Sequence, residues 1–241
     1  IGTEEVSNGN FSQEGSELVT NGDFATDSDW NLGNGWSIED GVAKVDNTNT
    51  NYISQDGIVS DTKTYAITFT ILNYISGSIR LRLGNTYGDY VSGNGTYTKY
   101  IQCTTSNKFR VYSSPSGANL SIDNVSVKEV GQDWSLGSGW SIGEDKAICD
   151  GTSSNLIQSI SGSANKNFSL TFTISNYISG SVIPAFVGNS SDSLVYSSNG
   201  TFTEVISSGS DIRFVFYGAS FNGSITNISV KEVGQDWTLG T

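Results

Sequence analysis

The sequence predicts an all-β protein: two tandem β-sandwich domains of about 100 residues each, with the start of a third repeat. Three observations predict this fold class. Thr-Phe-Thr-Ile at residues 68–71 returns 103 positions later at residues 171–174, and other stretches return at the same interval. Apolar and polar residues alternate with a period of two inside each copy. Clusters of Gly, Asn and Ser separate these stretches, and no amphipathic helix pattern interrupts them.

The repeats set the domain boundaries. Residues 1–27 form a junction that holds two similar segments, residues 5–11 and 17–24, and the opening strand of the first domain is expected at residues 17–25. The first repeat then covers residues 28–131 and the second covers residues 132–234. Residues 235–241 begin the unit again with Gln-Asp-Trp-Thr-Leu-Gly-Thr, which is the stub of a third repeat.

The elements of the first copy follow in order along the chain. A hairpin is predicted at residues 36–45, because the Asp40-Gly41 dipeptide favours a tight two-residue turn. The alternation in residues 65–71 predicts a half-buried strand. Residues 79–83 place three aliphatic side chains on one face and the arginines 80 and 82 on the other, and neither arginine has a counterpart in the second copy. Along the last strand the apolar residues switch from one set of alternate positions to the other. This switch predicts an extra residue, a β-bulge, at residues 123–124 and again at 226–227.

Aromatic residues recur at the start of each unit. Trp30, Trp134 and Trp237 stand at equivalent positions, and Trp36 and Trp140 follow in the two complete copies. Large aromatic side chains repeated in every unit are typical of core packing, so we expect a structural role for them. The two cysteines lie at non-equivalent positions and are interpreted as isolated thiols.

Composition excludes several function classes. Acidic residues outnumber basic ones by 24 to 12, and this net charge of −12 disfavours nucleic-acid binding. No apolar run approaches the roughly 20 residues that span a membrane. The absence of histidine excludes Ser-His-Asp and Cys-His catalytic sites and the usual zinc sites. Paired carboxylates remain possible by residue type, but Asp123 and Glu129 are not placed as an acid/base pair, so we expect no enzyme activity.

Three stretches of the first copy resemble a known family. Leu-Val-Thr-Asn-Gly-Asp-Phe at residues 18–24, Gly-Trp-Ser-Ile at 35–38 and Ile-Asp-Asn-Val-Ser-Val at 122–127 resemble carbohydrate-binding modules of the galactose-binding-like jelly-roll type. These stretches are most similar to those of tandem copies in bacteriophage virion proteins such as tail fibres. The resemblance covers nearly the whole chain and implies jelly-roll domains, glycan partners and an extracellular or virion-surface location. It says little about the ligand, because one scaffold hosts many functions.

The resemblance also implies a structural calcium ion in the first copy. Asn21, Asp23 and Asp123 match the positions that hold it in the family, and calcium prefers such oxygen ligands. The second copy lacks the Asn-Gly-Asp-Phe opening directly before its body and has Thr226 at the aspartate position. The alternative is an exposed turn with an aspartate that caps the bulge. No other cofactor is expected.

A sugar site needs aromatic rings and polar groups of fixed geometry, and the candidates are tyrosines and cations. Two strand positions in each copy are predicted to face outward, beside phenylalanines that point inward. Other tyrosines lie in the repeated Asn-Tyr-Ile-Ser-Gly-Ser segment and in the Gly/Asn-rich loop after it. The candidates are Lys108, Tyr112, Arg213 and Tyr217 on strands, Tyr74 and Tyr177 in the repeated segment, and Tyr87, Tyr90 and Tyr196 in the loops. For the strand positions, an ordinary cross-strand polar pair is the alternative; for the repeated segment, it is a structural turn.

Two hypotheses for function follow. The first is a non-catalytic adhesion protein whose tandem modules contact cell-surface glycans. The second is a structural repeat of a fibre, filament or surface coat without a ligand, which assembles with copies of itself or with neighbouring virion or fibre proteins. Residues 235–241 could complete a β-domain in a neighbouring chain by strand exchange.

Overall fold

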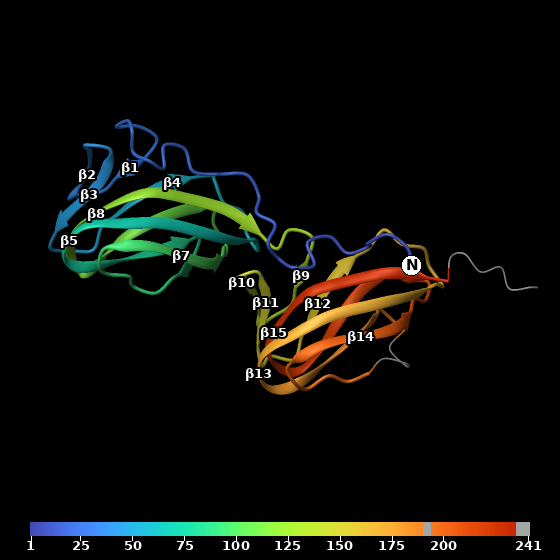
Figure 1. The fold of residues 1–241 in the computed structure, drawn as a ribbon. Helices are drawn as coiled ribbons and strands as arrows, with labels where there is room; N and C mark the ends of the chain where they lie inside the picture. Colours follow the sequence, from blue (N-terminus) through green and yellow to red (C-terminus); the bar gives the residue numbers. More distant parts are fainter. Residues whose placement is uncertain (190–193, 235–241) are drawn as a thin grey trace, which may run out of the picture. The chain divides into compact units, whose positions relative to one another are not determined.

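The computed structural model describes residues 1–189 and 194–234, and every helix or strand in these ranges is a β-strand (Figure 1). The predicted all-β fold is therefore confirmed. The chain divides into two compact units. Residues 14–130 form the first domain, and residues 131 onward form the second domain together with residues 1–13. Within the described ranges, no helix has the length and apolar character that crossing a bilayer would require.

The first domain contains eight strands. They are β1 (Asn31–Leu32), β2 (Trp36–Glu39), β3 (Val42–Asn47), β4 (Tyr52–Asp56), β5 (Thr64–Leu83), β6 (Thr86–Tyr87), β7 (Gly95–Gln102) and β8 (Lys108–Val130). The first half of β5 lies between β7 and the second half of β8, and this layer continues through β3 to β2. The second half of β5 pairs with the first half of β8, which continues through β4 to β1. The long strands thus take part in both layers, as the predicted jelly-roll sandwich requires.

The long strands pass from one layer to the other at a sharp bend. Gly77 lies in this bend of β5 with a φ of +80°, a conformation that side chains disfavour. A Cβ atom at this position would also lie 2.3 Å from the carbonyl oxygen of Gly117 on β8. Both the backbone conformation and the close approach of the two strands therefore require glycine here.

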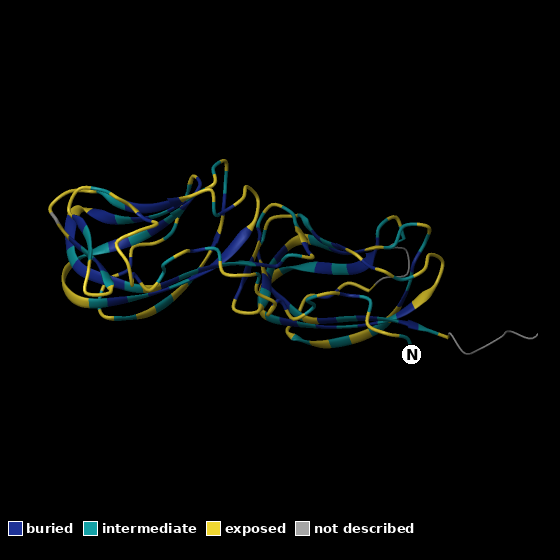
Figure 2. Cartoon of the chain, turned by 90° about the horizontal axis from the view of Figure 1, so that it is seen from above, coloured by how far each residue is buried: buried dark blue, intermediate teal, exposed yellow. Residues whose placement is uncertain are grey.

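The space between the layers is filled by the alternating apolar residues that the sequence indicates. Phe69, Leu81 and Phe109 are at most 1% exposed, and fully burying a side chain of this kind contributes about 1.5–3 kcal/mol. Figure 2 shows the buried and exposed positions alternating along the strands. Trp30 and Trp36 are buried as well, which confirms their structural role.

Two local predictions are confirmed in the strand register. Glu39 pairs with Val42, so Asp40 and Gly41 form a two-residue turn, and both have positive φ, as such turns demand. The register of β5 and β8 shifts between the Thr68 and Thr70 positions, and Asn124 in the bulge has a φ of 50°.

The second domain repeats this topology. Its strands are β9 (Ser135–Leu136), β10 (Trp140–Gly143), β11 (Lys146–Asp150), β12 (Asn155–Ser159), β13 (Asn167–Phe186), β14 (Gly200–Ser207) and β15 (Arg213–Val233). The long strands β13 and β15 pair as β5 and β8 do, with a bulge at Asn227, whose φ is 53°. Trp134 and Trp140 are buried. Trp237 and the predicted third-repeat stub lie outside the described residues.

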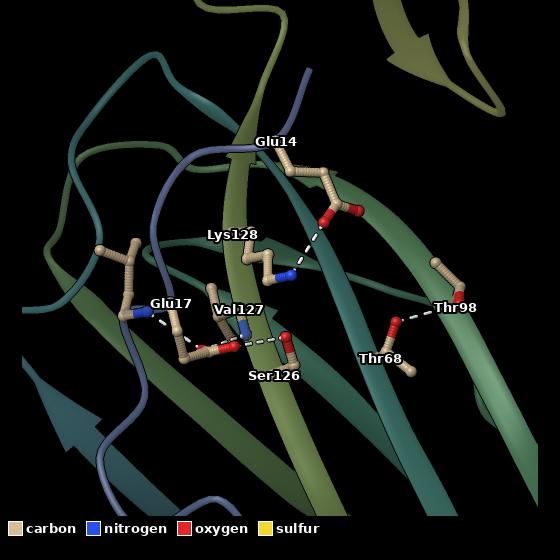
Figure 3. Close-up of polar contacts among 8 residues, drawn as sticks. Glu14, Glu17, Thr68, Thr98, Ser126, Val127 and Lys128 are labelled. Carbon is tan, nitrogen blue, oxygen red and sulfur yellow. Dashed lines mark hydrogen bonds and ion pairs between the residues drawn. The ribbon is translucent and has the colours of Figure 1, made fainter. Parts of the chain in front are cut away.

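Each domain is completed by an N-terminal segment that lies along its last strand. In the first domain, residues 14–24 run antiparallel to the end of β8, and the Leu18 N–H donates to the Val127 carbonyl at 3.1 Å. The Glu17 carboxylate accepts hydrogen bonds from the Val127 N–H at 2.8 Å and from the Ser126 hydroxyl at 2.5 Å (Figure 3). Lys128 forms an ion pair with Glu14 at 2.9 Å. We call residues 14–24 the first arm.

The second domain has an equivalent segment, although its body begins only at residue 131. Residues 1–13, the second arm, lie along β15, and the Glu4 carboxylate accepts hydrogen bonds from Val230 and Ser229 as Glu17 does from Val127 and Ser126. Asn-Gly-Asn-Phe at residues 8–11 takes the place that Asn-Gly-Asp-Phe has in the first arm. The sequence predicts one junction at residues 1–27, whereas the structure divides these residues after Gln13. The second domain thus takes its opening segment from residues 1–13, far upstream of its body.

Candidate functional site

One outer face of the first domain gathers cationic and aromatic side chains. On β5 and β8 the aliphatic residues Leu81 and Val111 point into the core, so their neighbours in sequence point outward. The strand register places Arg80 opposite Tyr112 and Arg82 opposite Arg110. Four outward side chains are therefore fixed on two paired strands, and rigid strands hold such groups more accurately than loops do.

Tyrosine rings form a connected row on this face. The ring centroids of Tyr52 on β4 and Tyr112 on β8 are 4.8 Å apart, and those of Tyr87 on β6 and Tyr112 are 5.9 Å apart. These distances lie in the range at which aromatic rings attract each other. Tyr87 is 45% exposed and Tyr90 is 42% exposed, so both present ring surface to solvent.

Arginine side chains cover parts of these rings. The Arg80 guanidinium carbon lies 4.0 Å from the Tyr87 ring centroid and 4.8 Å from that of Tyr90. Arg82 lies 4.8 Å from the Tyr87 ring, and Arg110 lies 5.1 Å from the Tyr52 ring. We call the set the Tyr–Arg face: Tyr52, Arg80, Arg82, Tyr87, Tyr90, Arg110 and Tyr112.

The three arginines of the Tyr–Arg face carry uncompensated charge. Among the described residues, no carboxylate forms an ion pair with any of them. Arg82 donates hydrogen bonds to the Tyr112 hydroxyl at 3.2 Å and to the Asn85 side chain at 2.6 Å, which are both neutral. A local cluster of three positive charges in a chain of net charge −12 favours an anionic ligand.

A hollow adjoins this face. It has a volume of about 320 Å³ and is lined by β1, β4 and the start of β8, including Tyr52, Asp56, Lys108 and Arg110. Lys108, one of the candidates from sequence, forms an ion pair with Asp56 at 2.9 Å across the strands. Two other hollows of the described first domain, about 290 Å³ each, have no aromatic side chain in their lining. Of these three hollows, the one beside Tyr52 is the best suited to a ring-shaped ligand.

The second domain lacks the equivalent cations. Ile183 lies opposite Tyr217, as Arg80 lies opposite Tyr112 in the first domain. Ala185 lies opposite Val215, where the first domain pairs Arg82 with Arg110. Asn155 faces Tyr217 where Tyr52 faces Tyr112. Of the candidates, Arg213 bonds to the Asp211 carboxylate, which raises the pKa of Arg213 and lowers that of Asp211. Tyr217 and Arg213 are thus present, but they are not part of a Tyr–Arg face.

Tyr74 and Tyr177 have the same structural contacts in the two domains. The Tyr74 hydroxyl donates to the Gly77 carbonyl at 3.2 Å, and the Tyr177 hydroxyl donates to the Gly180 carbonyl at 3.0 Å. Each backbone N–H donates to an asparagine side chain. These bonds brace the bends of β5 and β13, which accounts for the repetition of the segment without a ligand.

Tyr196 is a core residue, unlike the exposed Tyr87 and Tyr90. It is 9% exposed and packs against Phe172 and Phe202 at centroid distances of 5.0 and 4.6 Å. Its backbone pairs with Val182 as Val91 pairs with Ile79, so its counterpart in the first domain is Val91. Burial, together with the charge and hydrogen bond of Glu204, raises the pKa of Tyr196 to about 12. A ligand in solution has little access to such a side chain.

Two of the three residues predicted to hold calcium, Asn21 and Asp123, form hydrogen bonds within their own turns. The Asn21 amide nitrogen donates to the Thr26 and Ser28 carbonyls, and its oxygen accepts from the Thr26 N–H. The Asp123 oxygens accept from the N–H and the side-chain amide of Asn124. The described part of the chain contains no group of three or more His, Cys, Asp or Glu residues that could hold a metal ion. Asn21 and Asp123 thus form hydrogen bonds within their own turns, as the alternative of a capped turn expects, and a structural calcium ion in the first domain stays a prediction.

Comparison with known proteins gives only distant likenesses. No family model matches the chain, and no curated protein matches it. Among solved structures, the tandem CBM22-1–CBM22-2 domain of Xyn10C from Paenibacillus barcinonensis has 9% identity and a TM-score of 0.41, covering 92% of this chain and 99% of that one. A Paenibacillus xanthan lyase has 14% identity and a TM-score of 0.29, covering 87% of this chain and 25% of that one. Allantoicase from Saccharomyces cerevisiae has 8% identity and a TM-score of 0.31, covering 78% and 80%. Likenesses at this level carry no argument about ligands, and the fold assignment rests on the strand pairing described above.

Four members of the Tyr–Arg face were not among the candidates from sequence: Tyr52, Arg80, Arg82 and Arg110. The alternation in residues 79–83 had placed Arg80 and Arg82 on an outward face without assigning them a ligand. Arg110 shares the outward parity of Lys108 and Tyr112, so the alternation in β8 contains the signal for it. Tyr52 lies in a short strand in which apolar and polar residues alternate only weakly. Only the pairing of this strand with β8 places Tyr52 opposite Tyr112. Pairing between distant strands is the information that a period of two cannot supply.

Proposed function

We propose that this protein is a non-catalytic binding protein of an extracellular or virion surface, whose first domain contacts cell-surface glycans through the Tyr–Arg face. The observation that carries the proposal is the gathering of Arg80, Arg82 and Arg110 with four tyrosines on one exposed sheet face, without carboxylate partners among the described residues. The resemblance of the sequence to carbohydrate-binding modules supports the same class of ligand.

The chemistry of this face selects for acidic sugars. Tyrosine rings offer flat apolar surfaces to the C–H faces of a pyranose ring, and their hydroxyls bond to sugar hydroxyls. Guanidinium groups offer two parallel N–H donors to a carboxylate or a sulfate. We therefore infer that the preferred glycans carry uronic-acid carboxylates or sulfate groups.

A shallow face of this kind binds weakly as a single site. Its strength in the parent assembly comes from several linked copies, because the second contact is effectively intramolecular. Copies of the same chain or neighbouring virion or fibre proteins are the partners that would supply this multivalency.

The second domain suits the role of a spacer. Its counterparts of the three arginines are Ile183, Ala185 and Val215, so it lacks the charge that defines the first domain's face. This favours the alternative function, a structural repeat of a fibre or surface coat, for the second domain at least. The suggested strand exchange through residues 235–241 lies outside the described residues; unchanged assembly after their removal would reject it.

The proposal is tested with an array of neutral, carboxylated and sulfated glycans and the full chain. We expect binding to acidic glycans and at least a tenfold loss of affinity in the Arg80→Ala/Arg110→Ala variant, because each charge-assisted hydrogen bond contributes about 1.5–3 kcal/mol. Arg213→Ala in the second domain is the matched control and should bind as the unaltered chain does. Equal binding by all three proteins, or no binding to any glycan, would overturn the proposal, provided that circular dichroism shows the same strand content.

A further inference from the structure

The second arm occupies a groove that recognises it through both backbone and side chains. The Glu5 N–H donates to the Val230 carbonyl at 2.9 Å, and the Ile228 N–H donates to the Gly9 carbonyl at 2.9 Å. Glu4 accepts from the Val230 N–H at 2.7 Å and from the Ser229 hydroxyl at 2.6 Å. An extended segment is thus added to the edge of β15, which is the geometry by which many domains bind peptides.

Two buried side chains of the second domain, Gln158 and Trp134, contact the centre of the arm. The Gln158 side chain, 3% exposed, accepts from the Ser7 N–H and donates to the Ser7 carbonyl, both at 2.8 Å. Trp134 donates from its indole nitrogen to the Asn8 carbonyl at 3.2 Å and packs on Phe11 at a centroid distance of 5.3 Å. Phe11 is only 1% exposed, so the arm contributes an aromatic side chain to the core of the second domain.

The first domain repeats these contacts with its own arm. Gln55 bonds to the N–H and the carbonyl of Thr20 at 3.2 and 2.6 Å. Trp30 donates to the Asn21 carbonyl at 3.0 Å and packs on Phe24 at 5.2 Å. Recognition therefore follows a pattern that both arms share: glutamate, a valine two positions later, then Asn-Gly-x-Phe. Each groove therefore recognises a local sequence pattern, whether the arm is adjacent to its domain in sequence or remote from it.

A close approach makes the glycine of this pattern obligatory. A Cβ atom on Gly9 would lie 2.0 Å from the Ile228 carbonyl oxygen, and one on Gly22 would lie 2.0 Å from the Val125 carbonyl oxygen. Each oxygen belongs to the backbone of a long strand, β15 for Ile228 and β8 for Val125, so relief of the clash requires a shift of the strand or of the arm. Replacement of this glycine by alanine, which adds one methyl group, should therefore prevent the segment from fitting the groove.

We propose that the groove along β15, between Gln158 and Trp134, is a segment-binding site that also accepts residues 1–13 from a second copy of the chain. The arm reaches its domain only through the whole first domain, because it is joined to residue 131 by residues 14–130. Its fit to the groove depends on contacts made locally, so an arm from another molecule can make the same ones. Exchange of an identical element between copies links them without any new interface.

The concentration of the chains determines whether a groove holds the arm of its own chain or the arm of a second copy. The covalently joined arm acts at an effective concentration that is set by its connection through residues 14–130, so sufficiently dilute chains keep their own arms. Crowding of chains in an assembly, or cleavage near Gln13, which is exposed, removes this advantage. The groove then takes whichever arm is available.

The first experiment frees the arm after the protein has folded. A protease site is inserted between Gln13 and Glu14, the folded chain is cleaved, and native mass spectrometry follows the fragment. We expect the fragment to stay bound and to be replaced by a fluorescent peptide of residues 1–13. The same peptide with Gly9→Ala should exchange at least tenfold less. If the second domain unfolds on cleavage and the unaltered peptide restores it, the groove also accepts the arm in trans. Loss of the fragment without any binding of the peptide overturns the proposal.

The second experiment tests exchange between whole chains. A chain without residues 1–13 offers an open groove, and a full chain with Gln158→Ala offers an arm that its own groove holds weakly. We expect the mixture to form a one-to-one complex on size-exclusion chromatography, and we expect no complex when the donor chain also carries Gly9→Ala. Absence of the complex at concentrations where the peptide binds limits the groove to peptides and refutes exchange between copies.

Discussion

The indole nitrogen of Trp134 donates a hydrogen bond at 3.2 Å to the carbonyl of Asn8, 126 positions earlier in the chain. Trp30 makes the same bond at 3.0 Å to Asn21, only 9 positions earlier. The local chemistry of the two bonds is equal, but the lengths of the loops they close differ. Loop closure costs about 0.6 kcal/mol for each doubling of length, so the roughly fourteenfold longer loop costs about 2 kcal/mol more, and the other contacts of the arm must offset this cost.

The glycines of the two arms should control the two domains separately. Gly22→Ala places a Cβ against the Val125 carbonyl and should destabilise the first domain, and Gly9→Ala should destabilise the second, each by about 1–3 kcal/mol. Thermal unfolding with two resolved transitions measures this. Gly209→Ala is the control, because its Cβ would meet no atom closer than 3.8 Å. Equal shifts of both transitions by either variant would contradict the division of the arms.

Both cysteine thiols should report on the opening of their own domain. Cys103 is 0% and Cys149 is 1% exposed, and burial raises the pKa of both thiols, which slows their reaction with disulfide reagents. We expect slow labelling of the native chain, faster labelling of Cys103 in Gly22→Ala and faster labelling of Cys149 in Gly9→Ala. Mass spectrometry of the labelled peptides distinguishes the two sites. Rapid labelling of both thiols in the unaltered chain would be inconsistent with this burial.

Acid should weaken the first domain through Glu17. Burial acts to raise the pKa of Glu17, but hydrogen bonds from the Ser126 hydroxyl and from the N–H groups of Val127, Val19 and Leu18 outweigh it, so the pKa lies below the ordinary 4.5. The unfolded chain therefore takes up this proton first, and the stability that Glu17 supplies is present above pH 4.5 and is lost as the pH falls through the lower folded value.

Denaturant unfolding of the first domain at a series of pH values measures this effect. Glu17→Gln should lower stability at neutral pH and flatten the dependence below pH 4.5. Glu14→Gln is a neighbouring control, since it removes only an exposed ion pair with Lys128, and such pairs contribute about 0–1 kcal/mol. If Glu14→Gln and Glu17→Gln behave alike, the hydrogen bonds to β8 are not the cause.

Alkaline pH should weaken the second domain through Tyr196. Burial, with the charge and hydrogen bond of Glu204, raises the pKa of Tyr196 from 10.0 to about 12. The stability that this neutral hydroxyl supplies is complete below pH 10 and is lost as the pH rises toward 12. Absorbance titration should show a late tyrosine ionisation that Tyr196→Phe removes and Tyr87→Phe does not. A Tyr196→Phe chain with an unchanged titration would contradict this assignment.

Salt should weaken glycan binding by the Tyr–Arg face. Arg80, Arg82 and Arg110 attract an anionic sugar through charge, and exposed charges are screened over about 8 Å at an ionic strength of 0.15 M. We expect affinity for acidic glycans to fall as sodium chloride is raised from low salt, and binding to any neutral glycan to change little. Affinity that is independent of salt would mean that the tyrosine rings, and not the arginines, dominate recognition.

The sequence by itself determined the strands and the faces of their side chains. Alternation in residues 65–71 and 79–83 predicts which residues enter the core, because successive side chains of a strand point to opposite faces. The Asp40-Gly41 turn and the bulge at Asn124 were predictable for the same local reason, since backbone conformation at these positions depends on neighbouring residues.

Only the tertiary structure decided which distant residues meet. Tyr52 joins Tyr112, Tyr196 enters the core, and residues 1–13 complete the domain that begins at residue 131. Each of these outcomes depends on the pairing of strands far apart in sequence. A strand pattern has the same period whichever partner it takes, so the choice is made by packing of the whole domain and not by any local preference.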